Sequence, residues 1–102
     1  MIIDHRTYTI TPRRMKEYMD VYMRLAMPVQ RRHIGEPVGL YLTEVGTQGE
    51  FVNLWAYDDY GDMERKRNAR DADPEWALYL KESTGLIVAQ VTKIICPVSL
   101  KS

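Results

Sequence analysis

The segment FVNLWAY, residues 51–57, constrains the fold more than any other part of the sequence. If it forms a β-strand, alternate side chains point to opposite faces of the sheet. One face is then aliphatic, with Val52, Leu54 and Ala56, and the other carries aromatic groups and one amide. Neither face has the charged residues of a solvated surface, so we expect a central strand that is covered on both sides. The second set is Phe51, Asn53, Trp55 and Tyr57.

Capping and turn signals around this segment predict two helical regions and three further strands. The first helix is predicted to begin with Thr11 as its N-cap and Pro12 in its first turn, and Pro28 is expected to bend or interrupt it. The second helical region is predicted to be split, with Asp59 capping its first part and Asp73 its second. The four strands are predicted at residues 2–10, 38–45, 51–57 and 87–96.

Helical periodicity predicts which side chains these helices bury. The basic run at residues 65–70 follows acidic residues at the start of its helix, an order that suits the helix dipole, and is predicted to be a solvated face. The last helix is expected to bury Trp76, Tyr79 and Leu80. The apolar stripe of the first helical region consists of Met15, Tyr18, Met19, Tyr22, Leu25 and Ala26.

The order of these elements is β-α-β-β-α-β, with the second helix split in two. This order is typical of the ferredoxin-like fold, an α+β arrangement in which helices cover one face of a four-stranded antiparallel sheet. Its usual strand order, 4-1-3-2, places the first and third strands together at the centre of the sheet. Because the third strand is apolar or aromatic on both faces, the face without helices is expected to meet a partner.

Size and charge limit the classes of function. The 102 residues are expected to form one domain, residues 1–102. The formal net charge is +0, from 14 basic and 14 acidic residues, which argues against a nucleic-acid partner or an acidic membrane surface held by bulk electrostatics. The lone Cys96 cannot form an internal disulfide, and no apolar run is long enough to span a membrane, so we expect a cytoplasmic protein.

The chain resembles the NIPSNAP family in four motifs that occur in the same order. The resemblance covers nearly the whole chain and implies a dimeric α/β barrel, in which two ferredoxin-like subunits pair through the open faces of their sheets. It therefore implies a homodimer, and a single domain of the bacterial type. The family has no established chemical activity. The motifs are HRTYTITP at 5–12, PVQRRHIGEPVG at 28–39, VNLWAYDDYGDMERKR at 52–67 and ADPEWALYL at 72–80.

The same architecture is shared by small monooxygenases, several of which bind a ligand between sheet and helices; for this chain that comparison is an analogy of fold. By this analogy one face of each central strand is expected to face the helices, and the opposite face to line the barrel. The helix-facing set is Asp4, Arg6 and Tyr8 with Asn53, Trp55 and Tyr57. The barrel set is Ile3, His5 and Thr7 with Val52, Leu54 and Ala56.

The helix-facing set suggests a ligand site, and each residue has a structural alternative. Arg6 offers a planar fork of donors for a carboxylate or phosphate, or it simply pairs with Asp4 beneath packed aromatic rings. Asn53 could donate to a developing oxyanion, and Tyr8 could pass a proton. His33 could act as a proton carrier or haem ligand, or interact with a helix dipole. The candidate ligand-binding residues are Arg6, Tyr8, His33, Asn53, Trp55 and Tyr57, the last two as stacking surfaces.

Two functional hypotheses follow from these observations. The first is a protein that binds a small aromatic or anionic metabolite in each subunit, with monooxygenase-like chemistry as an option. The alternative is a non-catalytic dimerisation or interaction module without a ligand. The 2 histidines and 1 cysteine are widely spaced and form no metal motif, so neither a metal nor haem nor any other cofactor is expected.

Overall fold

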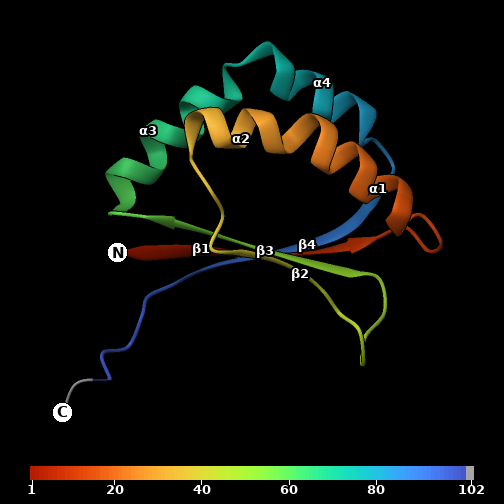
Figure 1. Ribbon diagram of the computed structural model, residues 1–102, viewed down its shortest axis with the longest axis horizontal. Coiled ribbons are helices and arrows are strands. Elements are labelled where there is room, and N and C mark those ends of the chain that lie inside the picture. Colours follow the sequence, from red (N-terminus) through yellow and green to blue (C-terminus); the bar gives the residue numbers. More distant parts are fainter. Residues whose placement is uncertain (101–102) are drawn as a thin grey trace.

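The computed structural model describes residues 1–100 as a four-stranded antiparallel sheet with helices on one face (Figure 1). The strand order β2-β3-β1-β4 confirms the predicted order, with β1 and β3 at the centre. The class is therefore α+β, with ferredoxin-like topology. The strands are β1 (Ile2–Ile10), β2 (Gly39–Leu42), β3 (Glu50–Tyr57) and β4 (Ile87–Ile95).

The first helical region begins later than predicted. It consists of α1 (Met15–Val21), the π-helical turn η1 (Tyr22–Ala26) and α2 (Met27–His33). The prediction of Thr11 as the N-cap is wrong, because its hydroxyl donates to the carbonyl of Gly85 at 2.6 Å and Arg13 adopts a left-handed φ of 68°. Pro28 lies in the first turn of α2, so the regular helix is interrupted by the π turn just before it.

The second helical region is split as predicted into α3 (Tyr60–Asp71) and α4 (Pro74–Glu82). The carboxylates of Asp59 and Asp73 accept hydrogen bonds from backbone N–H groups in the first turns of these helices, so both predicted caps are confirmed. The predicted burial of Leu80 is wrong, since this residue is 54% exposed. Trp76 and Tyr79 follow the three-residue spacing of the inner face of α4, and Leu80 lies on its flank.

Strand β2 is shorter than the predicted strand at 38–45, and β4 ends one residue earlier than predicted. β2 is an edge strand with a single neighbour, β3, and beyond Leu42 the chain turns away from it. The turn that leads into β3 begins within the predicted strand. It contains Gly46 and Gly49, which both have a positive φ that only glycine adopts at no steric cost.

Aromatic side chains fill the space between the sheet and the helices. The ring of Tyr22 packs edge-on against Phe51 with centroids 4.9 Å apart, and the hydroxyls of Tyr18 and Tyr79 share a hydrogen bond of 2.7 Å. Gln30 donates to the hydroxyl of Tyr22 at 2.9 Å. Burial raises the pKa of Tyr79 to about 12, so this phenol stays protonated in the core. The predicted stripe of the first helical region faces this core.

The two faces of the sheet are those predicted. β3 alternates strictly, with Asn53 and Trp55 buried beneath the helices and Leu54 partly exposed on the other face. The register pairs Arg6 with Asn53 and His5 with Leu54, so the helix-facing and open sets of β1 and β3 lie side by side. The helices lie on one side of the sheet, and the open face is turned away from them (Figure 1).

Candidate functional site

Arg6, in the middle of β1, is paired with Asp4 and lies beside the hydroxyl of Tyr8. Its Nε donates to both carboxylate oxygens of Asp4, at 3.1 and 3.2 Å. These two bonds leave the terminal amino groups for other partners, and 13% of the side chain remains exposed to solvent. Burial opposes its charged form, but the hydrogen bond to Asp4 and nearby negative charge raise the pKa of Arg6 above its ordinary value. The guanidinium is therefore permanently charged and able to donate further.

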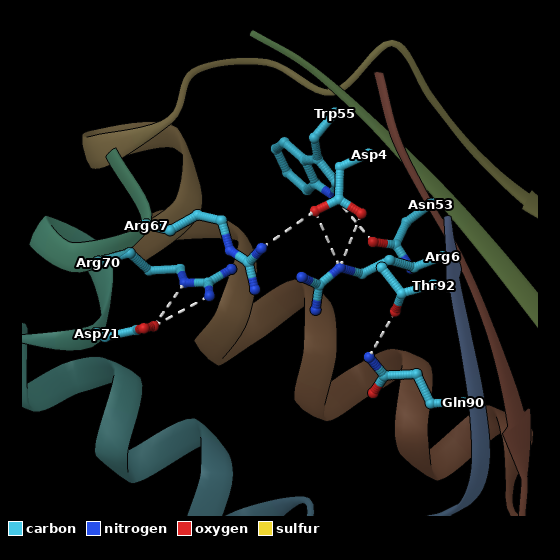
Figure 2. Close-up of polar contacts among 9 residues, drawn as sticks. All are labelled: Asp4, Arg6, Asn53, Trp55, Arg67, Arg70, Asp71, Gln90 and Thr92. Atoms are coloured by element: carbon cyan, nitrogen blue, oxygen red, sulfur yellow. Dashed lines mark hydrogen bonds and ion pairs between the residues drawn. The ribbon is translucent and has the colours of Figure 1, made fainter. Parts of the chain in front are cut away.

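Helix α3 brings two more guanidinium groups to the same place (Figure 2). Arg67 Nη1 lies 3.8 Å from Asp4 Oδ2. Arg70 donates through Nε and Nη2 to Asp71 at 3.1 and 3.0 Å, and its guanidinium carbon lies 4.3 Å from the centroid of the Trp76 ring. These groups form the arginine cluster: Arg6, Arg67 and Arg70.

The basic run at 65–70 is thus not a solvated face throughout, and the prediction was wrong for Arg70, which is only 7% exposed. Lys66 and Arg67 are partly buried, whereas Arg65 is exposed as expected. The signal that could have revealed this is the spacing of Met63 with Arg67 and Arg70, which places all three towards one side of a helix. Sequence analysis therefore missed two members of the site.

The cluster carries more positive than negative charge. Three guanidinium groups face two carboxylates, buried Asp4 and exposed Asp71, which leaves an excess of one positive charge. The three arginines lie near the buried hydroxyl of Tyr57. Burial and the charge of Asp4 raise the pKa of this hydroxyl, whereas the three arginines lower it. An anion at this position would be attracted by converging positive charge.

Asn53, next to Arg6 in the register, has a donor without a partner. Its Oδ1 accepts a hydrogen bond of 2.8 Å from the indole N–H of Trp55. Because the indole can only donate, this bond fixes the orientation of the amide. The other end of the amide, Nδ2, is buried and has no hydrogen-bond partner, in a residue that is 1% exposed. Such a group costs about 1–3 kcal/mol, which a bound acceptor would recover.

The remaining aromatic residues of the predicted site are packed in the core. Trp55 and Tyr57 are 2% and 3% exposed, so neither ring offers a free face for stacking. Tyr8 contacts Phe51 with ring centroids 6.1 Å apart, and its hydroxyl contributes to the raised pKa of Arg6. The structure therefore brings these residues together with Arg6 and Asn53, and it assigns them packing roles around the polar groups.

His33 has a different partner. At the end of α2, its Nε2 lies 2.8 Å from Asp73 Oδ2 at the start of α4, and Arg32 Nη1 binds the same oxygen at 2.7 Å. The hydrogen bond from His33, the backbone N–H of Glu75 and Arg32 together lower the pKa of Asp73 to about 2. The His33 side chain thus clamps two helices, and its hydrogen bond does not run to the arginine cluster.

A cavity of about 390 Å³ runs along one flank of α3 and shares one residue, Arg67, with the cluster. Its lining includes Arg67, which contacts Asp4, and Asp71, which holds Arg70. On the sheet, Gln90 and Thr92 of β4 are exposed beside Tyr8 and Arg6 in the register. Solvent therefore reaches the arginine cluster from outside. The full lining of the cavity is Tyr60, Met63, Glu64, Arg67, Asn68 and Asp71.

Two further properties of residues 1–100 bear on the class of site. No group of three or more His, Cys, Asp or Glu side chains in this part of the chain is arranged to hold a metal ion. Within the same residues, every helix is too short or too polar to cross a membrane.

The fold is a ferredoxin-like domain in which helices cover one face of the sheet and leave the other face open. The family model for NIPSNAP matches residues 3–101. A NipSnap homolog from Dictyostelium discoideum is 30% identical over 96 residues, or 93% of this chain and 42% of that protein. The chain thus spans less than half the length of that curated relative. The chain belongs to the NIPSNAP family.

Solved structures agree with this assignment. A NIPSNAP family protein with unknown function, Atu4242 from Agrobacterium tumefaciens, superposes with a TM-score of 0.92 at 30% identity, covering 99% of this chain and 91% of that chain. A candidate antibiotic biosynthesis monooxygenase from Nitrosomonas europaea superposes with a TM-score of 0.66 at 10% identity, covering 97% and 100%. The second likeness extends to the fold alone.

Proposed function

We propose that this protein binds a small organic anion at the arginine cluster. The observation that carries the proposal is the excess of guanidinium over carboxylate groups at a place that solvent reaches. The unpartnered Nδ2 of Asn53 supports it, because a buried donor lacks only an acceptor. The 10% identity to the monooxygenase-fold protein supports no reaction, so the proposal is binding, and oxygenase-type chemistry would take place at the same site.

The geometry suggests how an anion would be held. Only Nε of Arg6 donates to Asp4, so the terminal amino groups, with the Tyr8 hydroxyl beside them, would present the planar fork that suits a carboxylate. Arg67 contacts Asp4 at 3.8 Å, longer than a hydrogen bond, so turning towards a ligand would lose little. Asn53 Nδ2 would supply a neutral donor from the sheet.

Isothermal titration with benzoate tests the proposal. Arg67→Met removes one cation whose contact with Asp4 is long, at 3.8 Å, and Arg6→Lys keeps a charge for Asp4 while removing the fork. We expect both variants to bind benzoate at least tenfold more weakly than the wild type. Arg24→Met is the matched control, since Arg24 forms an exposed pair with Asp20 on the first helical region. Failure of the wild-type protein to bind, or equal binding by all variants, would refute the anion site.

We also propose a homodimer that forms through the open sheet face, in the cytoplasm. Apolar side chains extend across all four strands of this face, and Tyr41 and Val91 are exposed on its outer strands. His5 Nδ1 is buried there without a partner, a donor or acceptor that a second subunit could satisfy. This surface is also the feature that favours the second candidate function, an interaction module without a ligand. The unpaired Cys96 suits a reducing compartment.

A further inference from the structure

We propose that a second ligand site lies at the end of the sheet where the chain passes from β1 to α1, and that it binds a medium-chain alkyl carboxylate. This inference goes beyond the proposed function, because the site shares no residue with the arginine cluster. The site is a cavity of about 420 Å³, a volume within the usual range for small-molecule sites. Its lining comes from the end of β1 and the turn into α1, from the loop at 48–49, and from Val88 of β4.

The three segments are held together at the end of the sheet. The end of β1 and the start of β4 lie beside each other beneath α1 (Figure 1). The N–H of Ile10 donates to the carbonyl of Gly49, in the loop before β3, at 2.8 Å. The register between β1 and β4 shifts after Thr9, which leaves Val88 as an extra residue on β4. Such bulges are frequent next to functional sites, where they redirect side chains.

Arg13 is the charged residue of the cavity. It adopts a left-handed φ of 68°, a backbone conformation that residues other than glycine rarely adopt because it is strained. Within residues 1–100, no acceptor pairs with its guanidinium, and no carboxylate belongs to the lining of the cavity. Strained residues cluster at ligand sites, so an unpaired guanidinium on a strained backbone indicates a site for an anion.

The segment around Arg13 adds to the positive charge. Residues 13–17 contain three cations and one acid. Arg14 donates to both carboxylate oxygens of Glu17, at 2.7 and 2.8 Å, so these two charges neutralise each other. Arg13 and Lys16 remain as an excess of positive charge, which attracts an anion to this end of the sheet. The fork of Arg13 suits a carboxylate.

The rest of the lining favours an alkyl chain. Pro12 and Met15 belong to the turn into α1, and Val88 lines the cavity from β4. Val88 is 60% exposed, so a bound chain would remove its apolar surface from water. The lining that residues 1–100 provide has no aromatic face on which a ring could stack, and the thioether of Met15 adapts to a flexible group. The favoured ligand is therefore a carboxylate with a flexible alkyl chain.

Titration calorimetry with octanoate, butyrate and octanol tests this inference. We expect octanoate to bind at least tenfold more tightly than butyrate, whose chain is shorter, and than octanol, which has no charge. Arg13→Asn removes the guanidinium, and asparagine tolerates the left-handed backbone. This variant should bind octanoate at least tenfold more weakly while its Tm is unchanged or higher, and Arg13→Lys should retain part of the affinity. Arg31→Gln, at an exposed pair with Glu36 on α2, is the control for the loss of a charge.

A second variant tests the apolar wall. Val88→Thr keeps the shape of the side chain and makes it polar, so it should weaken octanoate several-fold and leave butyrate unchanged. Val38→Thr is the control, at a valine that is 52% exposed just before β2.

The outcomes separate this inference from the proposed function. Equal affinities for octanoate and butyrate, wild-type affinity of Arg13→Asn for octanoate, or no octanoate binding at all would overturn the alkyl carboxylate site. If Arg67→Met loses octanoate while Arg13→Asn keeps it, the ligand occupies the arginine cluster, so the second site fails and the proposed function stands. Benzoate binding should be unchanged in Arg13→Asn. Failure of benzoate to bind to the wild type would refute the proposed function alone.

Discussion

Replacing Arg6 by Met tests whether Asp4 is a desolvated charge that depends on its partner. Asp4 is buried, and its nearest cation is Arg6 Nε at 3.1 Å, with Arg67 Nη1 further away at 3.8 Å. The methionine keeps an apolar stem and removes the donor, so the carboxylate stays buried with only the longer contact. Removing one partner of a buried pair destabilises a protein by about 3 kcal/mol, mainly because the remaining charge is uncompensated.

A double-mutant cycle measures this dependence. Arg6→Met and Asp4→Asn should each lower the free energy of unfolding by about 3 kcal/mol, and the double variant by about 3 kcal/mol instead of the additive value of about 6. For 102 residues, a loss of about 3 kcal/mol corresponds to a fall in Tm of roughly 12–24 °C. Urea unfolding followed by the fluorescence of buried Trp55, at one protein concentration, provides the measurement.

The control cycle uses Arg24 and Asp20, an exposed pair at 3.4 Å. Its coupling energy should stay below about 1 kcal/mol, as for other surface pairs. The reasoning fails if Arg6→Met costs less than about 1 kcal/mol, or if the losses from Arg6→Met and Asp4→Asn simply add. Either result would mean that solvent or Arg67 already screens Asp4, and that the pairing of Arg6 Nε with Asp4 adds little to stability.

Two further predictions concern the helix clamp and the open sheet face. The folded-state pKa of Asp73 is lowered from 3.8 to about 2, so its stabilising effect is complete above about pH 4 and is lost as the pH falls through 2. Asp73→Asn, which keeps a capping oxygen, should therefore flatten the dependence of Tm on pH between 4 and 2; an unchanged slope would contradict the clamp. Leu54→Asp should convert the dimer to a monomer in sedimentation at micromolar concentration, whereas Leu80→Asp, on exposed α4, should not; a wild-type monomer would refute the dimer.

The sequence by itself was enough for the element order, the two faces of the central strands and the caps of α3 and α4. These are local properties: alternation in residues 51–57 assigns each side chain to one of two faces, and Asp59 and Asp73 cap the helices that follow them. Local signals failed where distant segments compete. Thr11 has the composition of an N-cap, but its hydroxyl is used by Gly85, which is far away in the chain.

Only the tertiary structure decided which charged groups form the site. Residues 65–70 hold several cations that are equivalent by sequence, and the rotation of α3 over the sheet brings Arg67 to Asp4 of β1 and buries Arg70 against Trp76, while Arg65 faces solvent. The same packing buries the rings of Trp55 and Tyr57 and directs His33 to Asp73. Side-chain convergence depends on how helices and sheet are placed relative to one another, and this placement comes from the sum of many core contacts that no single motif encodes.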